Sequence, residues 1–225
     1  MAEDARQLPL DLPAPPRYGR EDFLRAPCND AALTLIERWP AWPAPSLLLA
    51  GPPGAGKSHL SAIWARRAGA LEIRPEALPS VAALAEAAPL ALALDGLERV
   101  CDETALFHLL NFATERGVSL LMTARRLARA EDVRLPDLLS RLRRAPVMEI
   151  GAPDDDLMRA VLEKLFRDRQ LVVDNGVLDY AALRLERSLE AARAFVEALD
   201  RESLAQGRRA TRVLAGEVLR RFTEP

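Results

Sequence analysis

A glycine-rich stretch near residue 50 combines the residue types that bind nucleotide phosphates. It reads Gly-x-x-x-x-Gly-Lys-Ser, and its members are Gly51, Pro52, Pro53, Gly54, Ala55, Gly56, Lys57 and Ser58. Glycines let backbone amides curl around phosphate oxygens, and a helix that follows points its positive end at the same anion. In such a loop the lysine reaches the β- and γ-phosphates, and the serine hydroxyl binds magnesium. The pattern predicts a P-loop that binds a purine nucleoside di- or triphosphate with Mg²⁺.

An acidic residue at the end of another apolar run completes the predicted magnesium site. Asp95 follows the run 90–94 directly, where an acid can hold magnesium through its water shell. ATPases of this kind usually place a second acid next, to orient the attacking water, but the next residue is Gly96. Glu98 can take that role only if the turn brings it back. We therefore expect the protein to bind nucleotide well and to turn it over slowly, as a weak ATPase.

Short apolar runs alternate with helical patterns up to about residue 150. Strands are expected at 46–50, 90–94, 118–122 and 146–150, and helices at 29–39, 58–68 and 103–116, with Asn29 or Asp30 capping the first. Continuous apolar runs suit strands that are buried on both faces, and their alternation with helices predicts an α/β fold with a parallel sheet. Such sheets bind ligands at the carboxyl ends of their strands, where the P-loop and Asp95 lie.

Strand patterns stop after Pro153, and the rest of the chain has the periodicity of helices. These are expected near 154–169, 175–184, 188–205 and 211–222, with Asp154 or Asp155 as an N-terminal cap and Gly207 as a stop. We therefore expect a boundary near Gly151. It divides an extended tail (1–17) and a nucleotide-binding α/β domain (18–151) from a small all-α lid domain (152–225).

The composition is that of an ordinary globular protein, with 49% apolar and 28% charged residues. A formal net charge of -2 gives no overall basic field, so any contact with DNA has to be local or indirect. The two cysteines, Cys28 and Cys101, have no metal-ligand spacing. The start Met-Ala-Glu-Asp lacks a signal-peptide pattern, and no apolar run approaches the roughly 20 residues that span a bilayer. The expected location is the cytoplasm, without membrane association.

Several motifs together resemble the AAA+ core of the bacterial replication initiator DnaA, over nearly the whole chain. They resemble still more closely the shorter DnaA-related regulators of the Hda type, especially the alphaproteobacterial form. The motifs are the P-loop followed by His59-Leu60, Leu94-Asp95-Gly96-Leu97-Glu98, Leu121-Met122-Thr123, the segment 135–142 with Ser140-Arg141-Leu142, and the closing helices. The resemblance implies a P-loop AAA+ parallel sheet with flanking helices, followed by a helical lid, and ADP or ATP with Mg²⁺ as the cofactor.

The two ends of the chain add to this resemblance. Residues 7–12 read Gln-Leu-Pro-Leu-Asp-Leu, similar to peptides that dock into the hydrophobic pocket of the replicative sliding clamp. The glutamine supplies amide donors and acceptors, and the leucines are apolar anchors of an extended peptide. The residues implied in clamp binding are Gln7, Leu8, Leu10 and Leu12. The chain stops at Pro225 after the lid-like helices, so no DNA-reading domain and no direct sequence-specific DNA binding are expected.

Arg141 and Thr123 are the catalytic residues that the resemblance implies. An arginine at the Ser-Arg-Leu position acts across a subunit interface on the neighbour's γ-phosphate, where its planar cation stabilises the transition state. The alternative for Arg141 is a surface salt bridge. Thr123 corresponds to the sensor-1 region, although Arg125 replaces the acidic residue that DnaA often has two places later.

Four further residues are implied in nucleotide binding. Arg187, in the segment 187–192, resembles the lid arginine called sensor 2 that contacts the phosphates, with Arg184 and Arg193 as alternatives. Tyr18 and Phe23 precede the first helix, where the family packs a segment against adenine, and for both the alternative is core packing. His59 is assigned to the cofactor site but to no acid–base role.

The implied function is regulation of chromosome replication. An Hda-type protein binds adenine nucleotide, with ADP the expected form, attaches to the DNA-loaded clamp through residues 7–12, and presents Arg141 to the ATP held by DnaA. The expected result is hydrolysis of that ATP and repression of initiation. Two alternatives stay open: a DnaA-like targeting adaptor without a role in hydrolysis, and an autonomous ATPase such as a helicase loader. Self-association is left open as well.

Overall fold

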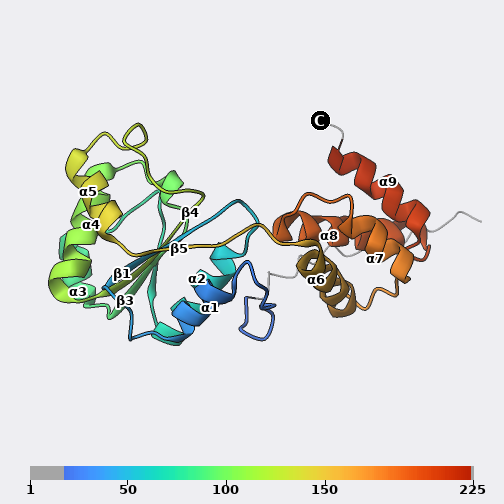
Figure 1. The fold of residues 1–225 in the computed structure, drawn as a ribbon, viewed down its shortest axis with the longest axis horizontal. Helices are drawn as coiled ribbons and strands as arrows, with labels where there is room; N and C mark the ends of the chain where they lie inside the picture. Colours follow the sequence, from blue (N-terminus) through green and yellow to red (C-terminus); the bar gives the residue numbers. More distant parts are fainter. Residues whose placement is uncertain (1–17, 224–225) are drawn as a thin grey trace, which may run out of the picture. The chain divides into compact units, whose positions relative to one another are not determined.

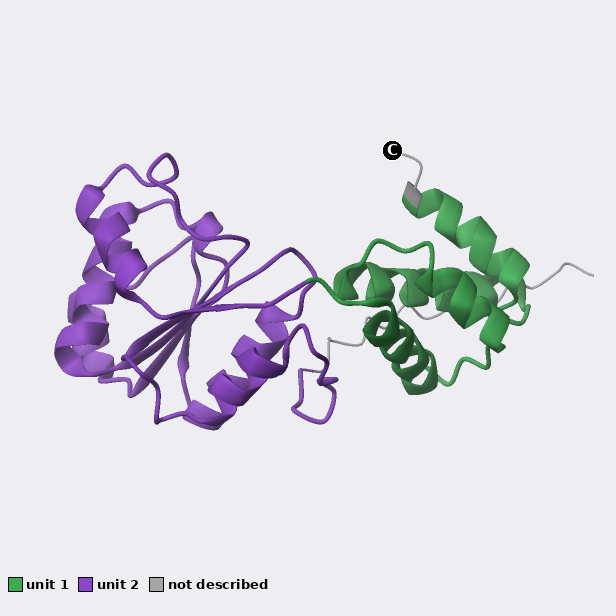
Figure 2. Cartoon of the chain, in the orientation of Figure 1, with its two compact units in different colours: residues 1–17, 152–225 green, residues 18–151 purple. Residues whose placement is uncertain are grey.

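The computed structural model describes residues 18–223, which form two compact units (Figure 2). The first contains residues 18–151 and the second residues 152–223. The clamp-binding segment predicted at Gln7, Leu8, Leu10 and Leu12 lies outside the described residues.

A five-stranded parallel sheet organises the first unit (Figure 1). Its strand order is β2-β3-β4-β1-β5, and its strands are β1 (Ser46–Ala50), β2 (Leu71–Ile73), β3 (Ala91–Leu94), β4 (Ser119–Ala124) and β5 (Val147–Glu149). The predicted parallel sheet is therefore confirmed, with shifted boundaries. Strand β4 extends to Ala124, so that Thr123 lies inside it, and Leu90 lies outside β3 with 82% of its surface exposed.

Strand β2 has no counterpart in the sequence analysis. It pairs with β3 at the edge of the sheet, and of its three residues only Ile73 is buried. A strand this short with one buried side chain produces neither an apolar run nor an alternating pattern.

Helices cover both faces of the sheet. On one face lie α1 (Asp30–Glu37) and α2 (Lys57–Ala68), whose apolar side chains pack with Leu47 and Leu49. On the other lie α3 (Val81–Ala87), α4 (Glu103–Arg116) and α5 (Pro136–Arg144), which pack around Leu48. Because successive side chains of a strand point to opposite faces, β1 needs apolar residues at every position, and all five of its residues are buried.

The first helix lacks the side-chain capping hydrogen bond that the sequence predicts. Asn29 is the N-terminal flanking residue of α1, but its side chain makes no capping hydrogen bond. Instead its amide oxygen accepts from the backbone N–H of Ala26 at 2.9 Å, and its amide nitrogen donates to the carbonyl of Leu24 at 3.0 Å. The buried amide therefore orders the preceding loop.

The second unit is all-helical. It consists of α6 (Asp155–Asp168), α7 (Asn175–Ala182), α8 (Leu189–Gln206) and α9 (Arg212–Thr223) around a core that includes Phe166 and Phe195. Asp154 caps α6 by accepting from Leu157 N–H at 2.8 Å, and Gly207 ends α8 at a φ of 59°. Among residues 18–223, no helix has the length and apolar character required to span a bilayer.

Candidate nucleotide-binding site

The P-loop joins the end of β1 to the first residue of α2. Gly54 and Gly56 have φ angles of 69° and 98°, in the left-handed region that favours glycine. Leu60 and Trp64 are fully buried and fix α2 on the sheet. The loop therefore turns directly into the N-terminal end of α2, whose positive end is what an anion site requires.

Lys57 is held at the base of this loop. Its ammonium group donates to the carbonyls of Gly51 at 2.8 Å and Pro52 at 2.7 Å, and the residue is only 9% exposed. Burial lowers the pKa of Lys57, and the charges of Glu98 and Asp95 partly oppose this shift. A largely buried cation whose hydrogen-bond partners are neutral carbonyls has charge available for an incoming phosphate.

Asp95 brings together residues from three segments of the chain. Its carboxylate accepts from the Ser58 hydroxyl at 2.9 and 3.1 Å and from the Thr123 hydroxyl at 2.6 Å. The Thr123 oxygen in turn accepts from the backbone N–H of Gly96 at 2.8 Å. Thr123 is therefore a positioning residue for Asp95 and for the turn after β3, and its contact does not need an acid two positions later.

Replacing Thr123 with valine, which has nearly the same shape, is expected to lower the free energy of unfolding of this unit by about 1–3 kcal/mol. The change removes the hydroxyl bond to Asp95 and leaves the buried Gly96 N–H without its partner. Urea unfolding followed by tryptophan fluorescence measures the effect, because all three tryptophans belong to residues 18–151. Thr123→Ser keeps the hydroxyl and should retain most of the stability; a valine variant as stable as the parent would contradict this role.

Gly96 and Glu98 show why the site lacks an obvious base for hydrolysis. Gly96 has a φ of 89°, and a Cβ atom there would lie 2.6 Å from Nε of Arg99. An acid at this position would therefore be strained. Glu98, the alternative base, forms an ion pair with Arg125 at 3.1 Å. Arg125 stands where DnaA often has an acid, and here it holds the Glu98 carboxylate.

Arg99 is a residue near the site that the sequence analysis missed. Its guanidinium donates to the backbone carbonyl of Asp95 at 2.5 Å and pairs with Glu76 at 3.3 Å. It therefore links the turn after β3 to the segment that follows β2. The sequence could have indicated this contact, because Arg99 follows Asp95 by four residues, and it lies on the short 3₁₀ helix Leu97–Arg99.

The aromatic residues near the N-terminal side of this unit surround His59. The His59 ring contacts the rings of Tyr18 and Phe23, each at a centroid distance of 5.2 Å, and its Nε2 lies 2.8 Å from the carbonyl oxygen of Gly19. Phe23 is only 5% exposed and belongs to the core. His59 thus anchors the segment that begins at Tyr18 beside the P-loop helix, while Tyr18 stays half-buried.

Arg141 does not join this cluster. Arg141 is half-buried on α5. Its neighbours on the helix, Leu138 and Leu142, belong to the core on the sheet face opposite α2. Arg187 belongs to the helical unit, where it pairs with Asp155 at 2.9 Å, while Arg184 lies over the ring of Tyr180. Within residues 18–151 the structure thus unites Lys57, Ser58, Asp95 and Thr123, but not Arg141.

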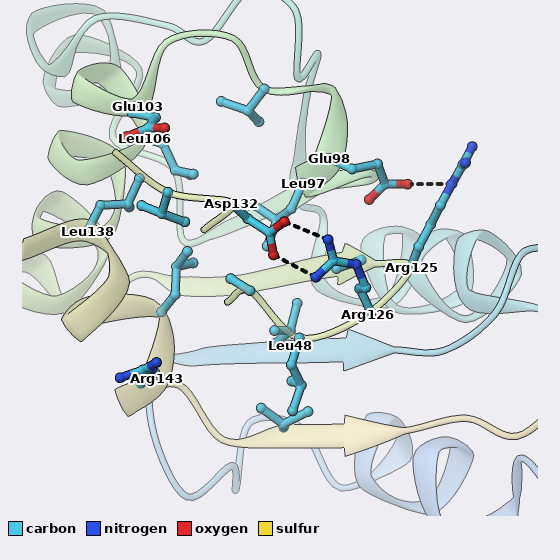
Figure 3. Close-up of a pocket in the computed structure, with 17 residues that line it drawn as sticks. Leu48, Leu97, Glu98, Glu103, Leu106, Arg125, Arg126, Asp132, Leu138 and Arg143 are labelled. Carbon is cyan, nitrogen blue, oxygen red and sulfur yellow. Dashed lines mark hydrogen bonds and ion pairs between the residues drawn. The ribbon is translucent and has the colours of Figure 1, made fainter. Parts of the chain in front are cut away.

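A cavity of about 690 Å³ lies beside the site, between the sheet and the segment that leads from β4 to α5 (Figure 3). Leu48, Leu106 and Leu138 are among its apolar lining residues. On its polar side Arg126 forms two hydrogen bonds with Asp132, at 2.6 and 2.5 Å, which lower the pKa of Asp132. Charge pairs therefore fix this segment where apolar packing is incomplete.

The residues at the P-loop fit a nucleotide with magnesium. The left-handed glycines shape the loop, Lys57 offers a cation, and Ser58 and Asp95 offer the hard oxygen donors that Mg²⁺ prefers. Magnesium at such sites takes one or two protein oxygens and completes its shell with phosphates and water. This set of groups can bind a nucleotide phosphate chain and order its metal ion.

Comparison with known proteins places this geometry in a known fold. No family model matches the sequence. Domain III of the replication initiation protein DnaA from Thermotoga maritima superimposes with a TM-score of 0.77 at 18% identity, covering 95% of this chain and 100% of that chain. A replication initiator DnaA bound to AMPPCP and single-stranded DNA gives a TM-score of 0.63 at 17% identity, covering 81% of this chain and 64% of that one.

A Thermotoga maritima RuvB variant gives a TM-score of 0.65 at 16% identity, over 86% of this chain and 67% of that chain. The similarity includes the parallel sheet, its flanking helices and the helical region that follows. The chain therefore has the AAA+ fold shared by these DnaA and RuvB domains.

Proposed function

We propose that this protein is a negative regulator of replication initiation that acts on the ATP of another AAA+ protein, DnaA. It binds an adenine nucleotide with Mg²⁺ at residues 51–58, with ADP as the expected ligand. It attaches to the DNA-loaded sliding clamp through Gln7, Leu8, Leu10 and Leu12, and it presents Arg141 to the nucleotide of DnaA. The action takes place in the cytoplasm.

The placement of Arg141 carries this proposal. Helix α5 packs with the sheet face opposite α2, and among the described residues the Arg141 side chain forms no hydrogen bond or ion pair that would occupy its charge. A half-buried, uncommitted guanidinium away from its own P-loop suits action on a neighbour's phosphate. The likeness to a DnaA domain III over 95% of the chain supports DnaA as that neighbour, because domains of one fold can associate head to tail through heterologous interfaces.

The nucleotide that this protein itself binds at residues 51–58 then has a structural role. Gly96 occupies the position of the usual second acid, and Glu98 is paired with Arg125. A site that binds phosphate but lacks a poised base retains its ligand. The clamp-binding segment contributes by proximity, because tethering two weakly interacting proteins to one clamp raises their effective concentration.

The test is hydrolysis of DnaA-bound ATP with and without this protein and DNA-loaded clamp. Stimulation is expected only when both are present. A variant with Leu10 and Leu12 replaced by alanine should lose clamp binding and most of the stimulation, while its nucleotide affinity stays that of the parent. Failure of the parent protein to stimulate hydrolysis would refute the proposal and favour the targeting adaptor.

Autonomous ATPase activity is a second candidate, and the position of Glu98 is the observation that favours it. Its charge opposes the lowering of the Lys57 pKa, so this carboxylate lies near the phosphate site. The pairing with Arg125 at 3.1 Å counts against its use as a base.

Purified protein is expected to hydrolyse ATP slowly, and Glu98→Gln should leave that rate within about twofold. A general base normally contributes about 10²–10⁴-fold, so a fall of this size would identify Glu98 as catalytic. Steady-state phosphate release measures the rate, with Lys57→Ala as the background. Rapid turnover that Glu98→Gln abolishes would establish the ATPase candidate instead.

A further inference from the structure

Two guanidinium groups lie over one aromatic ring in the helical unit. Cζ of Arg184 is 4.2 Å and Cζ of Arg212 is 5.1 Å from the ring centroid of Tyr180. Tyr180, on α7, is wedged against α9, because its hydroxyl would lie 3.3 Å from a Cβ atom at Gly216. Attraction between cation and ring quadrupole therefore holds two positive charges at one place between α7 and α9.

The loop between α8 and α9 adds two more arginines. Arg208 and Arg209 are exposed and line a hollow of about 340 Å³ at the start of α9. The loop is ordered by Ser203, whose carbonyl accepts from Arg208 N–H at 3.1 Å and whose hydroxyl donates to the Arg208 carbonyl at 2.5 Å. Ala210 is buried, and this anchors the loop while both arginine side chains face solvent.

These four arginines, which we call the α9 basic patch, differ from other arginines of the same unit. Arg159, Arg167, Arg169, Arg187 and Arg221 each pair with a carboxylate. Within residues 152–223, no carboxylate forms an ion pair with Arg184, Arg208, Arg209 or Arg212, although Glu217 lines the same hollow as Arg208 and Arg209. Arg184 and Arg212 share one ring and Arg208 and Arg209 share one hollow, so like charges lie close together in each pair, and a bound polyanion would relieve their repulsion.

We propose that the α9 basic patch binds the phosphate backbone of duplex DNA without reading its sequence. Guanidinium groups bind phosphate oxygens through paired N–H donors, and the N-terminal end of α9, beside Arg212, favours the same charge. The Tyr180 ring is in contact with two guanidinium groups and is thereby engaged, so bases have no free platform on which to stack. Backbone contacts of this kind position a protein on DNA and carry no sequence information.

Duplex DNA is the best match because it presents about one negative charge per 1.7 Å of its axis. The patch lies in the helical unit, outside the P-loop site, and its action requires neither Arg141 nor residues 7–12. A protein whose net charge is -2 can bind DNA in this way only through such a local concentration of positive charge.

Fluorescence anisotropy with a short labelled duplex of random sequence tests the inference on the full chain with ADP and Mg²⁺. We expect a Kd of about 10⁻⁴–10⁻⁶ M that weakens steeply between about 50 and 200 mM salt, as non-specific phosphate binding does. Arg208→Ala/Arg209→Ala should weaken binding and reduce the salt slope by about 2, one for each lost cation. The matched control Arg74→Ala/Arg116→Ala removes the same charge from exposed positions of the α/β unit and should bind like the parent.

The outcomes distinguish DNA binding at the α9 basic patch from non-specific attraction of DNA to any exposed arginine. Absence of binding at low salt, equal weakening by the control pair, or a strong preference for one sequence would overturn the proposal. Arg212→Lys keeps the charge but loses the planar fork, so an intermediate affinity is expected. Circular dichroism confirms that each variant is folded, and the assay contains neither DnaA nor clamp, so its failure leaves the proposed regulation untouched.

Discussion

Replacing Arg141 with alanine is expected to abolish the stimulation of DnaA-bound ATP hydrolysis. An arginine finger supplied in trans contributes about 10³–10⁵-fold to phosphoryl transfer, since its planar cation stabilises charge that develops on the transferring group. In the clamp-dependent hydrolysis assay, the stimulated rate should therefore fall by about 10³-fold or more, to the level of DnaA alone. Arg141→Lys should restore little activity, because a point charge does not reproduce the paired donors.

The same helix provides the control. Arg144 is exposed at the last position of α5 and contributes to no core, so Arg144→Ala should retain most of the stimulation. Clamp binding and nucleotide affinity of Arg141→Ala should equal those of the parent. Loss of clamp binding together with stimulation, or a lowered melting temperature, would show that Arg141 has a structural role.

Replacing Lys57 with alanine is expected to weaken nucleotide binding by about 10²-fold or more. Truncating a buried charged partner of an anion typically costs about 2–5 kcal/mol, and Lys57 is the cation at the base of the loop. Isothermal titration with ADP and Mg²⁺ measures the change. The ligand-free protein should lose little stability, because the pKa of Lys57 is lowered by burial, so removing the charge also removes a desolvation cost.

Ser58→Ala separates the metal from the phosphate chain. It removes the hydroxyl that bonds Asp95 and would face magnesium, so its effect on affinity should be clear with Mg²⁺ and small in its absence. A Lys57→Ala protein that binds ADP as tightly as the parent would contradict the assignment of the P-loop.

The prediction of secondary structure succeeded where one local signal was strong. Helix α4 begins and ends at the predicted residues, 103 and 116, because a capping Asp102 and a left-handed Gly117 mark its ends. It failed for α3, whose buried face is the single residue Leu84, and for α5, where charged residues outnumber the two buried leucines. A helix that buries one side chain gives weak periodicity, whereas α5 does carry an apolar face, with Leu138 and Leu142 four residues apart, in a segment of only nine residues.

The sequence by itself determined the phosphate-binding loop, the parallel α/β class and the helical character after residue 152. These properties follow from local backbone preference and from the apolar period along each segment, both of which can be read residue by residue. Only the tertiary structure decided that Thr123 holds Asp95 across 28 positions, that Arg125 pairs with Glu98, and that Arg184 and Arg212 share the ring of Tyr180. Such contacts depend on which strands and helices pack side by side, and a single polar or charged side chain carries no signal of its partner in the linear chain.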